Sequence, residues 1–260
     1  MSLYKSAINK LPRPLLIRLS YIFRFFAPYL YRGNAVACAI CQKTFSKFLP
    51  YGSNKAYREN VLCPHCLSLE RHRLLWLYLK EKTNLFSIKG KFLHIAPEQC
   101  FWNRFKKLSN LDYVTGDLES PLAAHHFDLH DVPFDDNSFD VVMCNHVMEH
   151  VENDIQCMAE LYRVLKPGGW AIMQVPIDFS RKDTLEDPEI QSPEDREKYY
   201  WQKDHLRLYG TDYPARLESV GFKVLRDRYA EEIDEKLIQK YRLQKEEVIY
   251  FAEKENPTLN

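Results

Sequence analysis

Four cysteines stand in two close pairs near the start of the chain, with a spacing that suits a metal ion. Two residues lie within each pair and twenty-one lie between the pairs; the four are Cys38, Cys41, Cys63 and Cys66. Paired thiolates of this kind hold zinc tetrahedrally, and four protein ligands leave no coordination position open. A redox dithiol is the alternative, but it normally opens a helix of a thioredoxin-like unit, which this sequence lacks. We therefore predict a structural Zn²⁺ ion.

A second group of candidate ligands forms the motif His146-x-x-Glu149-His150. It matches a zinc-peptidase pattern, in which both histidines lie in one continuous helix and a third ligand follows. Here the motif comes directly after the apolar run 139–144, which is typical of a buried strand. The motif therefore falls at a strand-to-helix turn, where His150 would pack against or cap the next helix. The sequence does not predict a peptidase centre.

The elements that must position these residues alternate from Lys91 onward. The predicted strands are 91–96, 112–116, 126–129, 139–144 and 169–175, with helices at 99–108 and 151–165. Helix 211–219 and strands 222–227 and 246–251 close the chain. Such alternation predicts an α/β fold with a mostly parallel sheet and helices on both faces.

One stretch of this region, from Phe127 to Trp170, carries a specific pattern. An acid, Asp128, precedes a proline, Pro133, by five positions; then come the strand FDVVMC, an amphipathic helix and the turn KPGG. In order and spacing this resembles the class I S-adenosylmethionine (SAM)-dependent methyltransferases, especially the type 11 group. The resemblance covers residues 91–252 and looks closest to bacterial members that bear a zinc ribbon. It implies a Rossmann-like sheet with an antiparallel last strand, and SAM as cofactor.

The resemblance assigns cofactor contacts to residues at the ends of the strands. Asp117 matches the acid that binds the ribose hydroxyls, and Leu118 follows it. Asp128 matches the acid that binds the adenine amine, with the backbone N–H of Leu129 facing the ring. Cys144 and Asn145, at the end of the fourth strand, complete this part of the predicted site.

The turn after the first strand departs from the family pattern. The family carries an acid and then alternating glycines, whereas this chain reads HIAPEQC, with His94 in place of the acid. Ala96, Glu98 and Cys100 stand where glycines are expected. Glycines there let the backbone approach a ligand closely. We predict a variant but functional loop, in which Glu98 pairs with the ammonium of the methionine moiety; a degraded loop that no longer binds SAM is the alternative.

The resemblance also indicates where an acceptor would bind. Asn145 and His146 follow the fourth strand on the turn that faces the methyl group, and an imidazole there could remove a proton during transfer. Many methyltransferases manage by alignment alone, so this base role is a hypothesis. The polar segment 178–210 lies where the family inserts acceptor-binding residues; the candidates are Asp183, Asp204, His205 and Arg207.

The chain divides by composition into a basic aromatic arm (1–34), a zinc ribbon (35–68) and a methyltransferase domain (69–254). Residues 1–60 hold ten Lys/Arg and one acid; since the formal net charge is zero, the remainder is acidic by about the same amount. The arginines and aromatic residues of 13–32 suit peripheral contact with an anionic membrane surface, the alternative being that they pack on the rest of the protein. We find no convincing secretory signal and no run of eighteen apolar residues, so we expect a cytoplasmic protein, peripheral at the inner membrane surface.

Together these features predict methyl transfer from SAM to an oxygen or nitrogen atom of a polar small molecule, a saccharide or a lipid-linked acceptor. One alternative is an RNA base methyltransferase that uses the zinc ribbon and the basic arm. The acidic body argues against a polyanionic partner, so we do not expect nucleic acid. The other alternative is a non-catalytic scaffold with a methyltransferase-like fold, which only the altered glycine loop favours.

Overall fold

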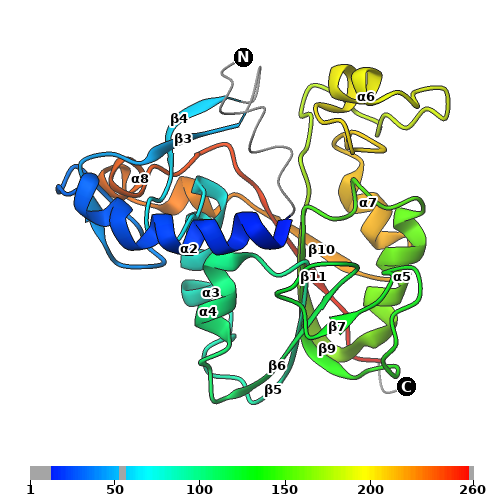
Figure 1. Cartoon of the computed structure of the whole chain (residues 1–260). Coiled ribbons are helices and arrows are strands. Elements are labelled where there is room, and N and C mark those ends of the chain that lie inside the picture. Colours follow the sequence, from blue (N-terminus) through cyan, green and yellow to red (C-terminus); the bar gives the residue numbers. More distant parts are fainter. Residues whose placement is uncertain (1–12, 53–56, 258–260) are drawn as a thin grey trace. The chain divides into compact units, whose positions relative to one another are not determined.

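The computed structural model describes residues 13–52 and 57–257, which form two compact units. One unit runs to Glu81 and includes Ala230–Lys245, and the other comprises Lys82–Tyr229 and the chain after Lys245 (Figure 1). The predicted boundary at 68/69 is therefore displaced, since the helix after it belongs with the cysteines. Part of the predicted basic arm, residues 1–12, lies outside the described residues.

The first unit is a set of short elements around the cysteines. Helix α2 (Arg13–Leu30) precedes the hairpin of β1 (Val36–Ala37) and β2 (Thr44–Phe45). A second antiparallel pair, β3 (Leu49–Tyr51) and β4 (Arg58–Leu62), is followed by α3 (Glu70–Glu81), and α8 (Glu235–Tyr241) returns to this unit later in the chain. No described helix is long and apolar enough to cross a membrane.

A buried arginine of α3 explains why α8 belongs to this unit. The guanidinium of Arg73 donates to the carbonyl oxygens of Val61 (2.9 Å) and Ser68 (2.8 Å) beside the second cysteine pair. Its Nε donates to the carbonyl of Tyr241 (2.6 Å) at the end of α8. Each bond satisfies a backbone acceptor that burial would otherwise leave without a partner. Arg73 thus joins three segments that are distant in sequence.

The second unit is built on a seven-stranded sheet with the order β10-β11-β9-β8-β5-β6-β7. Its strands are β5 (Gly90–Ile95), β6 (Leu111–Asp117), β7 (His125–His126), β8 (Phe139–Asn145), β9 (Leu165–Gln174), β10 (Lys223–Asp227) and β11 (Ile249–Glu253). All pairs are parallel except those of β11 with β9 and β10. The predicted α/β fold with an antiparallel last strand is confirmed.

The alternation of side chains along β5 shows how helices cover both faces of this sheet. Leu93 and Ile95 point into the core that includes Met158 of helix α5 (Asp154–Val164). Phe92 lies on the opposite face, where its ring meets Phe105 of helix α4 (Gln99–Phe105) edge to face, with the ring centroids 5.2 Å apart. A strand covered on both faces is buried on both, as residues 92–95 of β5 are.

Three further helical segments follow β9 in the chain. Helix α6 (Pro193–Tyr200) lies in the polar segment 178–210, where no helix was predicted, and α7 (Tyr213–Glu218) packs beside α5. A short 3-10 turn (Tyr229–Glu232) leads back to the first unit. Because β5, β6, β7, β8 and β9 run parallel, their carboxyl ends meet at one edge of the sheet, which is where open α/β sheets bind ligands.

Candidate functional site

The four paired cysteines converge in the first unit, and all four are buried. Their sulfur atoms lie within 4.8 Å of one another, with Cys38 Sγ 3.5 Å from Cys66 Sγ and Cys41 Sγ 3.7 Å from Cys63 Sγ. A tetrahedral zinc site with Zn–S bonds of about 2.3 Å has sulfur–sulfur edges of about 3.8 Å. The cluster therefore has the dimensions and the ligand set of a structural zinc site.

Both cysteine pairs lie in the same kind of tight turn. After the first pair, Gln42 adopts a left-handed conformation (φ 59°) and its N–H donates to the carbonyl of Cys38 (2.8 Å). After the second, Leu67 does the same (φ 59°), donating to the carbonyl of Cys63 (3.0 Å). Non-glycine residues seldom adopt this conformation. Its occurrence at equivalent positions of both turns indicates that the turns are shaped to aim sulfur atoms at one point.

At the carboxyl edge of the large sheet, the turn after β5 is built without glycine. Ala96 takes the left-handed conformation (φ 48°) that a glycine would adopt more easily, and its N–H donates to the carbonyl of Gly116 (2.8 Å). His94, which replaces the family's acid, is fully buried and lies 2.7 Å through Nδ1 from the hydroxyl of Tyr113. Its Nε2 lies 2.5 Å from Glu98 Oε2. His94 therefore helps to hold Glu98 in place.

Glu98 also connects this turn to the end of β8. The amide of Asn145 donates to Glu98 Oε1 (3.0 Å), so the carboxylate bridges the first and fourth strands at the edge of the sheet. The other amide atom, Asn145 Oδ1, is buried and accepts no hydrogen bond within the described chain. An unpartnered buried acceptor at this edge is a place where a bound ligand could supply the missing donor. Glu98 and Asn145, both predicted to contact the cofactor, thus lie together.

Two predicted cofactor residues, Asp117 and Asp128, lie at the carboxyl ends of neighbouring strands. Asp117 ends β6, and its Oδ1 accepts from the backbone N–H groups of Glu119 (2.8 Å) and Ser120 (2.7 Å). The second oxygen makes no hydrogen bond within the described chain. Leu118, beside it, exposes 64% of its surface, which leaves an apolar side chain available to a ligand at this edge.

Asp128 follows β7 and is exposed. Its Oδ1 accepts from the backbone N–H of His130 (2.9 Å) and lies 2.6 Å from His130 Nδ1, and these two contacts lower the pKa of Asp128. The side chain of Leu129 packs into the core, so only its backbone could face a ligand. Cys144 is likewise a core residue, and burial raises the pKa of its thiol, which leaves it protonated and inert.

The turn after β8 carries the His146-x-x-Glu149-His150 motif and is not helical, as predicted. His146 is left-handed (φ 54°), a conformation that is uncommon outside glycine, and its Nδ1 lies 3.3 Å from Glu149 Oε1. Burial alone would raise the pKa of Glu149, but the contact and charge of His146, with the charge of His150, outweigh it and lower the pKa. Glu149 is therefore a buried carboxylate beside His146, and sequence reasoning had given it no role.

Of the four predicted acceptor residues, two are exposed and two are buried. Asp183 and Asp204 lie at the surface, and Asp204 contacts His150 Nδ1 through its side chain (3.4 Å). His205 and Arg207 have no exposed surface. Arg207 donates to the carbonyls of Met148, Val151 and Glu152, and to Glu186 Oε1 (2.6 Å). Its guanidinium therefore supports the turn after β8 instead of binding an acceptor, which corrects that prediction.

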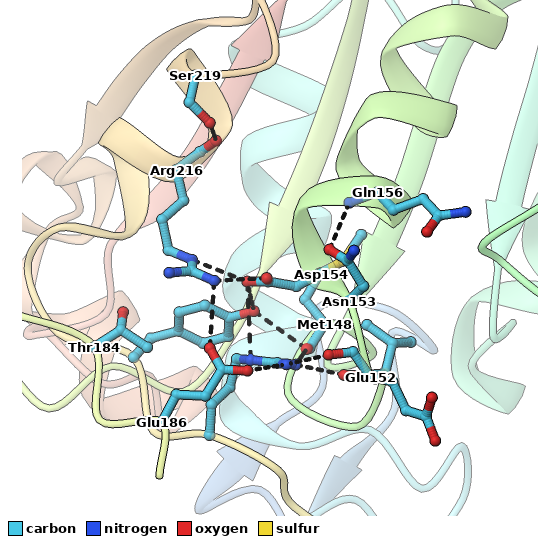
Figure 2. Close-up of polar contacts among 12 residues, drawn as sticks. Met148, Glu152, Asn153, Asp154, Gln156, Thr184, Glu186, Arg216 and Ser219 are labelled. Carbon is cyan, nitrogen blue, oxygen red and sulfur yellow. Dashed lines mark hydrogen bonds and ion pairs between the residues drawn. The ribbon is translucent and has the colours of Figure 1, made fainter. Parts of the chain in front are cut away.

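Figure 2 shows a network of polar contacts around Asp154, Glu186 and Arg216. Arg207 contacts both carboxylates of this network. Asp154, at the start of α5, accepts two hydrogen bonds from Arg216 (2.9 and 2.6 Å) and one from the hydroxyl of Tyr209 (2.7 Å). Burial would raise the pKa of Asp154, but Arg216, Tyr209 and Arg207 together lower it. Glu186 contacts both arginines. The network fixes the backbone that carries Glu149 and His150.

Comparisons with known proteins agree with this geometry. Residues 88–173 match a family model described as a methyltransferase domain. A demethylmenaquinone methyltransferase of Staphylococcus epidermidis is 43% identical over 58 residues, which cover 22% of this chain and 24% of that protein. A second one, from Chlorobaculum tepidum, is 36% identical over 83 residues, covering 32% and 29%. The chain thus spans less than a third of the length of either relative.

Among solved structures, that of the cyclase SpnF superposes with a TM-score of 0.50 at 14% identity, covering 92% of this chain and 96% of that one. This likeness concerns the fold alone. SpnF is a cyclase by name, so the fold by itself does not specify the reaction.

Proposed function

Residues 88–173 are a methyltransferase domain of the class I SAM-dependent fold, and on that premise we propose that the chain transfers a methyl group from SAM to an oxygen or nitrogen atom of an acceptor. One observation carries the proposal: the side chains able to bind a nucleoside and an amino acid gather at the carboxyl edge of one sheet. They are Asp117, Asp128, Glu98 and Asn145, at the ends of or just after β5, β6, β7 and β8.

Each of these residues suits one part of SAM. Asp117 keeps an oxygen for the ribose hydroxyls, and Asp128 with the Leu129 backbone suits the adenine edge. Glu98 carries negative charge for the methionine ammonium, while the unpartnered Asn145 Oδ1 can accept from the same group. Bound SAM supplies an electrophilic methyl carbon on a positively charged sulfur. Ala96 keeps the left-handed turn that lets the backbone approach the ligand.

His146 is the proposed base. Its Nδ1 faces the carboxylate of Glu149, which favours the tautomer with the proton on Nδ1 and the lone pair on Nε2. Nε2 is buried and has no hydrogen-bond partner in the described chain. It would take the acceptor proton as the acceptor lone pair bonds to the methyl carbon and the electrons of the broken C–S bond return to sulfur. A carboxylate that orients a histidine base is a recurring arrangement.

We propose a lipid-linked acceptor ahead of a free saccharide or other polar small molecule. Helix α2 favours this choice, because Ala27 is fully buried while five apolar residues expose 57–76% of their surface. These five are Ile22, Phe25, Phe26, Tyr29 and Leu30. Arg24 holds the helix to its own unit by donating to the carbonyl of His65 (2.5 Å). Such a helix suits the surface of an anionic membrane. The matched relatives whose names specify demethylmenaquinone agree with a lipid acceptor.

The function can be tested by following tritium from the methyl group of SAM into three fractions: membrane lipid, aqueous metabolites and total RNA. We expect label in the lipid fraction, and in a His146→Gln variant a loss of transfer with SAM affinity retained. Label in aqueous metabolites would support methyl transfer but show that the acceptor is a polar small molecule and not a lipid. Label confined to RNA would establish the alternative substrate. A protein that labels no fraction and binds no SAM would be a scaffold.

A further inference from the structure

A second group of potential metal ligands lies in the second unit, beside His146 and apart from the cysteines. Side-chain ligand atoms of Glu149, His150 and His205 lie within 4.8 Å of one another. Two of the three residues, Glu149 and His205, expose 1% or less of their surface. The motif around Glu149 does not form the helix that a zinc peptidase requires. The chain fold instead supplies its third ligand, His205, from fifty-five residues away.

The two histidines present lone pairs because their other ring nitrogens are already engaged. His205 Nδ1 lies 2.8 Å from the carbonyl oxygen of Tyr200, to which it can only donate, so its Nε2 carries the lone pair. His150 Nδ1 lies 3.2 Å from the carbonyl of Asp204, with the same consequence for its Nε2. Metal-binding histidines usually donate their second nitrogen to a carbonyl or carboxylate in this way.

Nothing in the described chain satisfies these inward-facing atoms. Glu149 Oε2 and His205 Nε2 are buried and make no hydrogen bond. His150 Nε2 lies 4.0 Å from Glu149 Oε1, too far for a hydrogen bond even if the imidazole were protonated. A buried carboxylate and two lone pairs facing one another are costly unless a positive charge or a donor lies between them.

The ligand atoms are also held in place by the backbone that carries them. The N–H of Leu206, next to His205, donates to the carbonyl of Glu149 (2.8 Å), so the two segments run side by side. Arg207 binds the carbonyls of Met148 and Val151 on either side of the ligands Glu149 and His150. Support of this kind lowers the cost of organising a metal site.

We propose that Glu149, His150 and His205 bind one divalent transition-metal ion. Two imidazoles and one carboxylate suit Zn²⁺, Mn²⁺, Fe²⁺ or Co²⁺ better than Mg²⁺ or Ca²⁺, which take oxygen ligands. Three protein ligands leave positions open, unlike the four cysteines. The role of the ion rests on the proposed function: it binds the acceptor oxygen beside His146 and lowers the pKa of that hydroxyl. Glu149 then has two roles: its Oε1 faces His146, and its unpartnered Oε2 is left for the ion.

The test is Mn²⁺ binding to the full-length protein, followed by electron paramagnetic resonance, because thiolates are poor ligands for Mn²⁺ and the cysteine site will not compete. We expect one Mn²⁺ per chain. Glu149→Gln and His205→Gln should each weaken binding by at least the roughly 10–100-fold that loss of an outer-shell partner causes. The matched controls are Glu194→Gln and His126→Gln, two exposed positions outside the cluster, which should bind as the unmodified protein does. Circular dichroism checks that each variant is folded.

The result that overturns the proposal is no binding of Mn²⁺, Co²⁺ or Zn²⁺ beyond the cysteine site at millimolar metal, or equal binding in both ligand variants and the controls. The first outcome would assign a buried water to the cluster. Affinity for S-adenosylhomocysteine (SAH), measured on the same metal-free samples, separates the metal proposal from the proposed methyltransferase function. If SAH binds and the metal does not, the metal site is rejected and the methyltransferase function is kept. If the metal binds and SAH does not, the methyltransferase function is rejected and the metal site is kept. If the ion holds the acceptor, His205→Gln, which leaves the cysteine site intact, should raise the KM for acceptor and leave SAH affinity unchanged.

Discussion

The cysteine cluster and the edge of the large sheet are assembled in opposite ways. The four cysteines come from two tight turns within one short segment, and backbone hydrogen bonds inside each turn aim the sulfur atoms at one point. The residues of the sheet edge come from positions 94 to 205 and are held by other side chains, above all Arg207. Buried atoms at this edge, such as Asn145 Oδ1 and His146 Nε2, have no partner in the described chain. We infer that the first region is a closed structural site and propose that a bound ligand completes the second.

Loss of metal should therefore affect the two regions very differently, and this is the largest effect we expect. Structural zinc contributes on the order of 10 kcal/mol to the folding of small modules. Cys41→Ser, or removal of zinc by a chelator, should unfold the cysteine unit and leave the sheet folded. Limited proteolysis should cut before Glu81 and within Ala230–Lys245, which belongs to the same unit, and should spare the stretch Lys82–Tyr229 between them. Metal analysis of the unmodified protein should give tightly held zinc. A Cys41→Ser protein with an intact N-terminal unit would contradict a structural zinc site.

Arg207 is the residue on which the second region most depends. In Arg207→Met the carbonyls of Val151 and Glu152 lose the guanidinium donor, and that of Met148 keeps only the Tyr209 hydroxyl. Asp154 loses a nearby positive charge. Removing one partner of a buried ionic network costs about 3–5 kcal/mol. Urea unfolding of the sheet unit should show a loss of this size. Lys182→Met, at an exposed position of the same polar segment, should change stability by no more than about 0.5 kcal/mol. Equal effects of the two substitutions would assign Arg207 no structural role.

Asp117→Ala tests the proposed ribose contact of the open region. Loss of a hydrogen bond to a charged group costs about 1.5–3 kcal/mol, which corresponds to about a 10–150-fold weaker affinity for SAM. Asp112→Ala removes the exposed acid at the other end of the same strand and should leave affinity unchanged. Isothermal titration measures both variants. Unchanged affinity in Asp117→Ala would exclude the ribose contact.

A smaller effect should appear as pH falls. The pKa of Asp154 in the folded protein lies below its ordinary value of 3.8, so its ionised form stabilises the fold fully above that value. This stabilisation is lost as pH falls through the lower, folded-state pKa, because the unfolded chain binds the proton first. Between about pH 5 and about pH 3 the urea midpoint should fall more in the unmodified protein than in Asp154→Asn. Parallel curves for the two proteins would show that Asp154 contributes nothing to acid stability.

The difference between the regions also explains what could be predicted from sequence. The cysteine spacing specified that cluster because its ligands are local, and apolar runs such as 139–144 specified the buried strands. Helix α6 was not predicted because it is mostly polar and lacks an apolar stripe; of its residues only Tyr200 is buried. Ser192 and Pro193 nevertheless form a helix-start signal, and the Ser192 hydroxyl accepts from the N–H of Asp195 (3.0 Å). The burial of Arg207 and the meeting of His205 with Glu149 depend on tertiary packing, which no local pattern records.

A nucleotide site at the edge of the sheet underlies the proposed function, and titration of the unmodified protein with SAH tests for it most directly. SAH carries the adenine, ribose and amino acid that Asp128, Asp117 and Glu98 are proposed to bind, and it cannot be consumed. We predict one site per chain in the micromolar range, the usual scale for metabolite sites. No heat with millimolar SAH, from protein whose sheet is shown to be folded, would contradict the account and identify the altered loop around Ala96 as a lost cofactor site.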